Sequence, residues 1–245
     1  MSKRQPRKVH HILPLPRLDT EREAPLGREV AQEVDFLIEV LGLRPNERIL
    51  DVAAGAGRHA LELARREFKH VTALDLSDQL LAIGKKASDA MGTAVDFRKG
   101  DPRKPIANAE YDAAFVLGGG AFGLMESDRD NQAILDATFQ ALKPGGRVAV
   151  SAMNLLHLIR HSKDLSDFDP NTCYLTTTET INVEGDVTEQ LPLNERYYGV
   201  PALTNAMDKA GFRNIMAFGA DPGRYSSRSV TLEDSEILVC AKRPK

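Results

Sequence analysis

The chain has 245 residues, and 42% of them are hydrophobic, which is enough apolar material for the core of a three-layer domain. Its 32 basic and 35 acidic side chains give a net charge of −3, so it lacks the basic surplus on which nucleic-acid binding depends. No apolar stretch approaches the roughly 20 residues that cross a bilayer, and the N-terminus has no apolar signal core. We therefore expect a cytoplasmic protein that binds neither nucleic acid nor a membrane.

The first residues of the chain combine basic side chains with prolines at positions 6, 14 and 16, which exclude a regular helix. We predict an N-terminal arm over residues 1–23 and one domain over residues 24–245. The arm is either a lid or a contact with an anionic partner, or else a solvated tail, which we favour for residues 1–9. Four apolar residues could anchor its later part on the domain: Ile12, Leu13, Leu15 and Leu18.

Hydrophobic periodicity predicts a regular alternation of helices and strands. From Arg28 to Leu41 apolar residues recur at helical spacing, and Gly42 follows, which predicts a helix whose role is packing. The predicted strands are 48–52, 70–75, 94–98, 112–117, 147–153, 213–219 and 235–242. The further predicted helices are 57–67, 77–91, 129–142 and 201–210. This alternation predicts a parallel sheet with right-handed crossovers, whose ligands bind at the carboxyl ends of the strands.

A glycine turn follows the first predicted strand, which ends in Asp51. Gly55 and Gly57 allow a positive φ and close approach of a ligand, and the next helix offers free N–H groups to a carboxylate or phosphate. With Asp75 twenty residues beyond Gly55, the turn also fits a loose dinucleotide pattern. Asp51 would repel a pyrophosphate, however, so a ligand with a positive charge, such as S-adenosylmethionine, is favoured over NAD.

The chain resembles the class I S-adenosylmethionine-dependent methyltransferases over roughly residues 30–245. The family motif D-x-G-x-G-x-G appears as Asp51 to Gly57, with Ala53 in place of the first glycine, and we expect the Ala53 methyl to fit at a negative φ. The turn Lys143-Pro144-Gly145-Gly146-Arg147 is also common in this family. The resemblance implies an α/β, Rossmann-like fold with a seven-stranded, mostly parallel sheet, helices on both faces and an antiparallel C-terminal hairpin.

The resemblance also implies S-adenosylmethionine as the cofactor. Asp75 stands where the family places an acid on the ribose hydroxyls, Asp101 where an acid accepts from the adenine amino group, and Arg58 could meet the methionine carboxylate. Asp101 could instead only start a turn before Pro102, and Arg58 could simply be exposed. The expected cofactor-binding residues are Asp51, Ala53, Gly55, Gly57, Arg58, Asp75, Leu76, Asp101, Pro102 and Leu117.

Two segments are expected to shape an acceptor pocket. The glycine turn at residues 118–123 follows the fourth strand, where the family places backbone atoms near the transferred methyl group. Residues 154–199 contain alternating Thr, Tyr, Ile and Val, which predict inserted antiparallel strands. We favour a cover over the substrate for this insert, with a dimer surface as the alternative. The expected acceptor-binding residues are Gly119, Gly120, Phe122, Asn154, Arg196 and Tyr198, although Phe122 could equally fill the core.

We expect neither a metal site nor a disulfide. Cys173 and Cys240 are isolated, which predicts reduced thiols, and Cys240 lies in an apolar run typical of a core. His157 and His161 are four residues apart, but no third ligand accompanies them.

The predicted function is methyl transfer to a nitrogen, oxygen or sulfur nucleophile of a small molecule by in-line displacement. Alignment and desolvation promote this reaction, so a general base is optional. The candidate bases, each of which also fits a structural or surface role, are His157, His161, Glu195 and Tyr197. The alternatives are a protein or RNA methyltransferase guided by the basic arm, a non-catalytic S-adenosylmethionine-binding scaffold or regulator, and an NAD dehydrogenase. We expect a monomer or a homodimer.

Overall fold

The computed structural model describes residues 28–118, 121–183 and 187–245. For the described residues from 179 to 191 it describes the backbone but not the side chains. The predicted arm at residues 1–23, together with Gly119 and Gly120, lies outside the described residues. The division into an arm and a domain that starts at residue 24 therefore stays a prediction.

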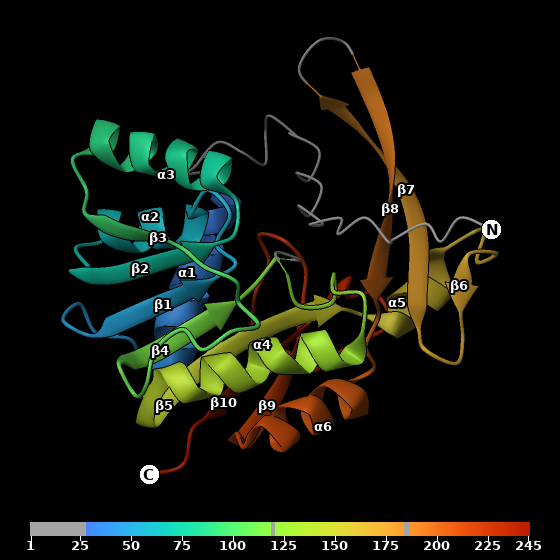
Figure 1. Cartoon of the computed structure of the whole chain (residues 1–245). Helices are drawn as coiled ribbons and strands as arrows, with labels where there is room; N and C mark the ends of the chain where they lie inside the picture. The colour runs from blue at the N-terminus through green and yellow to red at the C-terminus, as the bar shows by residue number, and fades with distance from the viewer. Residues whose placement is uncertain (1–27, 119–120, 184–186) are drawn as a thin grey trace, which may run out of the picture.

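A seven-stranded sheet forms the centre of the molecule, with the strand order β3-β2-β1-β4-β5-β10-β9 (Figure 1). Its strands are β1 (Arg48–Val52), β2 (His70–Asp75), β3 (Val95–Lys99), β4 (Tyr111–Val116), β5 (Leu142–Met153), β9 (Arg213–Ala220) and β10 (Glu236–Lys242). The first five strands pair in parallel, whereas β10 runs antiparallel to both β5 and β9. The predicted parallel sheet with an antiparallel C-terminal hairpin is confirmed. The strand order reverses between β1 and β4, and this is where such sheets bind ligands, beyond the carboxyl ends of the strands.

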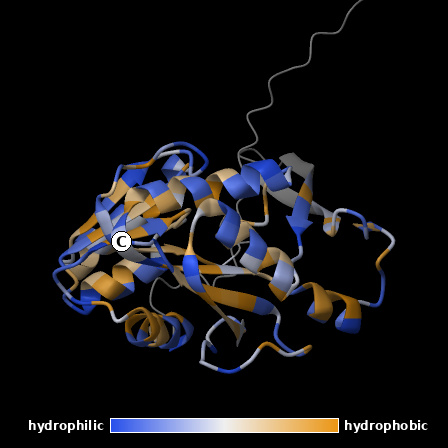
Figure 2. Ribbon diagram, turned by 90° about the horizontal axis from the view of Figure 1, so that it is seen from below, coloured by the Kyte–Doolittle hydropathy of each residue, from blue (hydrophilic) through white to orange (hydrophobic). Residues whose placement is uncertain are grey.

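Helices cover both faces of the sheet, as predicted (Figure 1). The face that carries Ile49 and Val71 packs against α1 (Arg28–Leu41) and α2 (Arg58–Arg65), with α3 (Asp78–Met91) beside them. The face that carries Leu50 packs against α4 (Asp128–Ala141) and α6 (Val200–Ala210). In Figure 2 the central strands are mostly hydrophobic and the helices carry both colours, as expected for a sheet covered by amphipathic helices. Each fully buried Leu, Ile or Val contributes roughly 1.5–3 kcal/mol.

Helix boundaries follow local capping chemistry. The Ser77 hydroxyl accepts a hydrogen bond from the Leu80 N–H at the start of α3, and Ser127 caps α4 in the same way. Pro201 lies in the first turn of α6, and Gly211 ends that helix in the left-handed conformation, as the sequence predicts.

The fifth strand differs from its predicted bounds. Helix α4 ends at Ala141, and β5 already begins at Leu142 rather than at residue 147. Leu142 pairs with Tyr111, and the register then shifts before Ala113 pairs with Arg147. The turn that we expected between helix and strand is therefore an irregular first part of β5, because its extra residues bulge while the pairing with β4 continues.

The insert at residues 154–199 forms a separate three-stranded antiparallel sheet, which confirms the predicted inserted strands. It consists of β6 (Phe168–Asp169), β7 (Tyr174–Val183) and β8 (Val187–Arg196). Figure 1 shows the β7–β8 hairpin projecting away from the seven-stranded sheet. A short helix, α5 (Leu155–His161), precedes it and was not predicted. In the part of the chain that is described, every helix is too short or too polar to cross a membrane.

Candidate cofactor site

The glycine turn between β1 and α2 has the expected backbone geometry. Gly55 and Gly57 have φ angles of 58° and 76°, in the left-handed region that favours glycine. A Cβ atom built on Gly57 would lie 2.8 Å from Cε1 of Phe97, whereas one on Gly55 would only touch Leu80 at 3.8 Å. Position 57 therefore requires glycine for its conformation and for space, and position 55 for its conformation alone.

The Ala53 methyl group was expected to fit on the condition of a negative φ, and this condition is not met, because the structure gives Ala53 a φ of 55°. Two backbone hydrogen bonds fix the turn around it: the Ala54 N–H donates to the Leu74 carbonyl at 3.0 Å, and the Gly57 N–H donates to the Ala54 carbonyl at 2.8 Å. The chain thus keeps a glycine-like conformation where the family motif has glycine. A left-handed alanine costs roughly 1–2 kcal/mol.

Asp75, at the end of β2, binds the backbone of the same turn. Its Oδ2 accepts a hydrogen bond from the Gly55 N–H at 2.8 Å, and its Oδ1 accepts one from the Ser77 N–H at 2.8 Å. Each carboxylate oxygen can accept a further hydrogen bond, so Asp75 can position the turn and still receive a ligand hydroxyl. Leu76, beside it, is 39% exposed. Contact of these two residues with a cofactor stays a prediction.

Asp51 is a buried carboxyl group at the carboxyl end of β1, with an exposure of only 2%. It accepts a hydrogen bond from the Ala60 N–H, but its Oδ2 has no hydrogen-bond partner among the described residues. Burial raises the pKa of Asp51 to about 6, although the nearby His59 and Arg58 lower it. A buried polar atom without a partner is costly, so this oxygen is suited to a donor or cation of a ligand.

A buried ionic cluster that the sequence did not predict lies behind Asp51. Glu33 of α1 is fully buried, and its Oε2 lies 2.6 Å from His59 Nε2 and 3.5 Å from Arg58 Nη2. Its Oε1 accepts a hydrogen bond from the Gly223 N–H at 2.7 Å. Burial raises the pKa of Glu33, but His59, Arg58 and the Gly223 N–H together hold it below its ordinary value. Helix α1 therefore carries a buried carboxylate of the site besides packing on the core. The sequence feature that could have predicted this is a glutamate on the apolar face of the helix.

Arg58 reaches from α2 to the carboxyl end of β4. A Cβ atom built on Gly118 would lie 2.9 Å from Arg58 Nη2, so the guanidinium group lies directly beside that glycine. The side chain is 27% exposed, which leaves part of its charge accessible at the edge where the strand order reverses. Leu117, just before Gly118, is buried in the core. This position suits the predicted contact of Arg58 with a carboxylate.

Asp101 and Pro102 follow β3. Both carboxylate oxygens of Asp101 accept hydrogen bonds from the Arg103 guanidinium at 2.9 Å, and Oδ1 also accepts from the Arg103 N–H. The hydrogen bonds from Arg103 hold the pKa of Asp101 below its ordinary value despite partial burial. Pro102 is buried. The turn-forming alternative accounts for these contacts, and binding of adenine by Asp101 and Pro102 stays a prediction.

Three of the six predicted acceptor-binding residues come together. The rings of Phe122 and Tyr198 stack with centroids 5.1 Å apart, and the Arg196 guanidinium lies 4.8 Å from the Tyr198 ring centroid. Arg196 also donates a hydrogen bond to Asp128 at 2.9 Å. All four residues line a cavity of about 630 Å³ beside α4 and α6. Phe122 is buried, as its core-filling alternative expects, and it also faces this cavity.

Asn154 is placed differently from the other predicted acceptor-binding residues. It is 1% exposed, its Oδ1 caps α5, and its Nδ2 donates to the carbonyls of Thr231 and Asp234. The amide group is thus used within the fold, and a contact with an acceptor stays a prediction.

The four candidate bases lie on the insert and on α5. His157 and His161 stack with ring centroids 4.4 Å apart, and His161 Nε2 lies 3.0 Å from an exposed Glu233 carboxylate. The Tyr197 hydroxyl donates to Glu195 at 2.6 Å, and burial raises the pKa of Tyr197 far above its ordinary value. Tyr197 is therefore poorly suited to lose its proton. Within the described residues no three His, Cys, Asp or Glu side chains are grouped to hold a metal ion.

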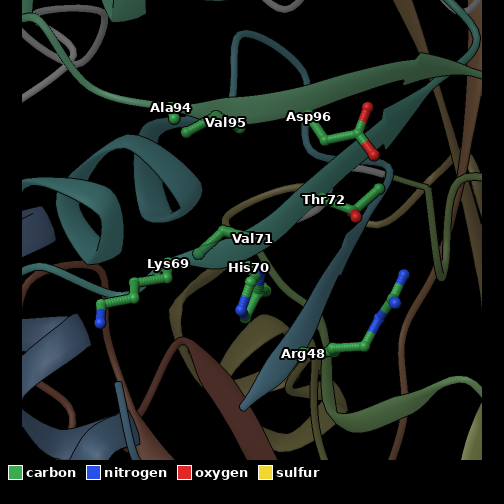
Figure 3. A pocket seen from close by; sticks show the side chains of 8 residues that line it. All are labelled: Arg48, Lys69, His70, Val71, Thr72, Ala94, Val95 and Asp96. Carbon is green, nitrogen blue, oxygen red and sulfur yellow. The ribbon is translucent and has the colours of Figure 1, made fainter. Parts of the chain in front are cut away.

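A second cavity, of about 300 Å³, lies at the opposite edge of the sheet (Figure 3). Its lining comes from the amino ends of β1, β2 and β3, including Arg48, His70 and Val95. Ligands of doubly wound sheets bind at the carboxyl edge, so this cavity is not the cofactor site.

The sheet order and the glycine turn beside Asp51 and Arg58 define the class of protein: an α/β fold of the class I methyltransferase type. Comparison with solved structures agrees. The CcbJ methyltransferase from Streptomyces caelestis superposes with a TM-score of 0.71, at 19% identity, over 93% of this chain and 96% of that one. An S-adenosylmethionine-dependent methyltransferase from Clostridium acetobutylicum gives a TM-score of 0.68, at 17% identity, over the same shares of the two chains.

Sequence comparison agrees with this fold. Residues 49–146 match the family model of a methyltransferase domain. The ubiquinone/menaquinone biosynthesis C-methyltransferase UbiE from Bartonella quintana is 36% identical over 107 residues. This match covers 42% of the chain and 39% of the relative, so the chain spans less than half the length of this curated relative.

Proposed function

We propose that the protein transfers a methyl group from S-adenosylmethionine to a small-molecule nucleophile. One observation carries the proposal: the carboxyl group of Asp51 and the partly exposed guanidinium of Arg58 lie at the glycine turn with opposite charges, and the buried Oδ2 of Asp51 has no hydrogen-bond partner among the described residues. The amino-acid end of S-adenosylmethionine is a zwitterion, so its ammonium suits Asp51 and its carboxylate suits Arg58. A pyrophosphate would instead meet the Asp51 carboxyl, which favours S-adenosylmethionine over NAD.

Different residues near the turn would contact the cofactor and the acceptor. Asp75 fixes the turn through Gly55 and keeps acceptor capacity for the ribose hydroxyls. The stacked Phe122 and Tyr198, with Arg196 over the latter, form one side of the cavity beside α4 and α6, and their rings suit contact with a planar acceptor. S-adenosylmethionine, when bound, supplies a methyl group already activated by the sulfonium. The protein therefore contributes mainly alignment and desolvation.

Four elements are candidates for the atom that accepts the methyl group. Nitrogen, oxygen and sulfur are the predicted nucleophiles, and the relative from Bartonella quintana is named a C-methyltransferase, which adds carbon to the set. The proposal includes a monomer or homodimer in the cytoplasm. Methylation of a protein or RNA, and a scaffold without turnover, remain the alternatives.

The first test is calorimetric titration of the full chain with S-adenosylmethionine, S-adenosylhomocysteine and NAD, each alone. We expect the first two to bind and NAD to give no heat of binding. Preferential binding of NAD would contradict the proposal. Release of S-adenosylhomocysteine is then measured over a panel of phenols, quinols, amines and thiols, and binding without turnover on every acceptor would favour the scaffold.

The Arg58 assignment has its own test. Arg58→Met should weaken S-adenosylmethionine binding by roughly tenfold or more, because one charge-assisted contact is lost. Binding of 5′-methylthioadenosine, which lacks the amino-acid end, should not change. Arg65→Met, on the same helix but with a half-exposed side chain paired to Glu62, is the matched control. Equal loss for both ligands would place Arg58 away from the carboxylate.

A further inference from the structure

The groups around Asp51 only partly stabilise the negative charge of its carboxylate. It is 2% exposed, its Oδ2 has no hydrogen-bond partner in the described part of the chain, and the Ala60 N–H is the one backbone donor that stabilises its ionised form. Its register partners on β2 and β4 are Ala73 and Phe115, which offer no charge.

The ionisable groups that face Asp51 come from two elements. Arg58 and His59 on α2 favour its ionised form, and Asp75 at the end of β2 opposes it. The two α2 side chains also share their contacts with Glu33 of α1, at 3.5 Å and 2.6 Å. Glu33 therefore offsets part of the positive charge near Asp51. With burial added, the pKa of Asp51 rises to about 6.

We propose that the ammonium group of the cofactor displaces a proton from Asp51 when it binds, so that cofactor binding and proton release form one coupled step. This inference rests on the proposed function. The carboxylic acid loses its proton to solvent, no covalent bond to carbon changes, and the resulting carboxylate pairs with the ammonium. The charge of the site is then balanced in the complex, and the unpaired Oδ2 gains its donor.

The coupling has a definite direction with pH. In the free protein Asp51 is mostly protonated below pH 6, so binding there must release nearly one proton. Near pH 6 the release should be about half a proton, and above pH 7 it should approach zero. The dissociation constant for S-adenosylmethionine should consequently be about tenfold larger at pH 5.0 than at pH 7.0.

The experiment is calorimetric titration of the full chain with S-adenosylmethionine between pH 5.0 and 7.5. At each pH it is repeated in two buffers with different heats of ionisation, and the difference gives the number of protons released. S-adenosylhomocysteine keeps the ammonium and should release the same number. 5′-Methylthioadenosine lacks it and should bind without release.

The outcomes separate this inference from the proposed function. Absence of S-adenosylmethionine binding at every pH would overturn the proposed function. Binding with a dissociation constant and a proton count that do not change with pH would overturn the coupling alone. Release with S-adenosylmethionine but not with S-adenosylhomocysteine would contradict the assignment to the ammonium group.

Variants identify the proton donor. Asp51→Asn should bind more weakly and release no proton. Glu236→Gln is the matched control, because Glu236 is also buried, burial raises its pKa, and its Oε2 has no hydrogen-bond partner within the described residues. His59→Gln controls for the neighbouring imidazole. Both control variants should keep the release, and its loss in either one would assign the proton to that residue instead of Asp51, even if Asp51→Asn does not bind.

Discussion

Residue 53 shows how a single side chain can conflict with its backbone. The turn holds Ala53 at a φ of 55°, a region where a Cβ atom is strained and glycine is not. Ala53→Gly should therefore raise the free energy of unfolding by roughly 0.5–1 kcal/mol, the relieved strain minus the greater entropy of an unfolded glycine. Urea unfolding at pH 7 measures the difference.

Ala54 provides the matched control for that variant. It is the next residue of the same turn, but it is not one of the alanines with a positive φ. Ala54→Gly should lower the free energy of unfolding by about 0.5–1 kcal/mol, because only the entropic penalty remains. A loss of stability in both variants would show that strain at residue 53 is not significant.

At the scale of elements, Glu33 joins α1 to α2 and to the loop before β10. Its buried carboxylate contacts His59 and Arg58 and accepts the Gly223 N–H, which lies 190 residues away in the chain. Glu33→Gln should lower the free energy of unfolding by about 3 kcal/mol at pH 7, because it removes the counter-charge of the Arg58 guanidinium and the buried partner of His59. Urea unfolding of the variant and the parent measures this loss.

The pH dependence of that loss has a predictable sign. The folded protein holds the pKa of Glu33 below its ordinary value of 4.5, so the stabilisation is complete above that value. It is lost as the pH falls through the folded-state pKa, and the difference between parent and variant should be smaller at pH 3.5 than at pH 7. Glu39→Gln, at an exposed position of the same helix, should have little effect at either pH. A difference that is constant with pH would exclude the ionic role of Glu33.

At the scale of the whole molecule, the β7–β8 hairpin belongs to a different sheet from the seven-stranded sheet that carries the proposed cofactor site. Beyond the pair Thr178 and Pro192, β7 and β8 pair only with each other among the residues that the structure describes. Replacing residues 179–191 by Asn-Gly, the turn that suits a two-residue hairpin, should change the free energy of unfolding by less than about 1 kcal/mol. S-adenosylmethionine binding should be retained.

The same shortened protein tests the role of the insert. If the hairpin covers the acceptor, transfer of the methyl group should fall while cofactor binding persists, and calorimetry combined with a turnover assay separates the two. If the hairpin is instead a dimer surface, sedimentation should show a change from dimer to monomer. A large loss of stability would mean that the hairpin belongs to the main fold.

Local patterns were sufficient to predict most of the fold. The spacing of apolar residues predicted the helices and strands, because burial on one face requires a fixed period, and glycine and proline marked several ends of elements. The glycine turn after β1 and the acids at the ends of β1 and β2 were predicted for the same reason: they are continuous in sequence. The family resemblance then implied a seven-stranded sheet with an antiparallel C-terminal hairpin, which is confirmed.

The polar contacts inside the site depend on residues far apart in the chain. Glu33 and His59 are 26 residues apart, so no local pattern links them. The sequence of α1, which carries Glu33, predicted only a helix that packs on the core. The stacking of Phe122 on Tyr198 and the position of Arg58 beside Gly118 likewise need the folded chain. Even the positive φ of Ala53 follows from hydrogen bonds to β2 and within the turn, against the preference of alanine itself.

The sequence by itself therefore determined the order of elements, the fold class and the place of the glycine turn, because these depend on local periodicity, turn chemistry and topology rules. Only the tertiary structure decided which charges surround Asp51 and how far they compensate it. Desolvation and pairing of a charge depend on every group packed around it, and those groups come from α1, α2 and β2, which meet only in the folded protein.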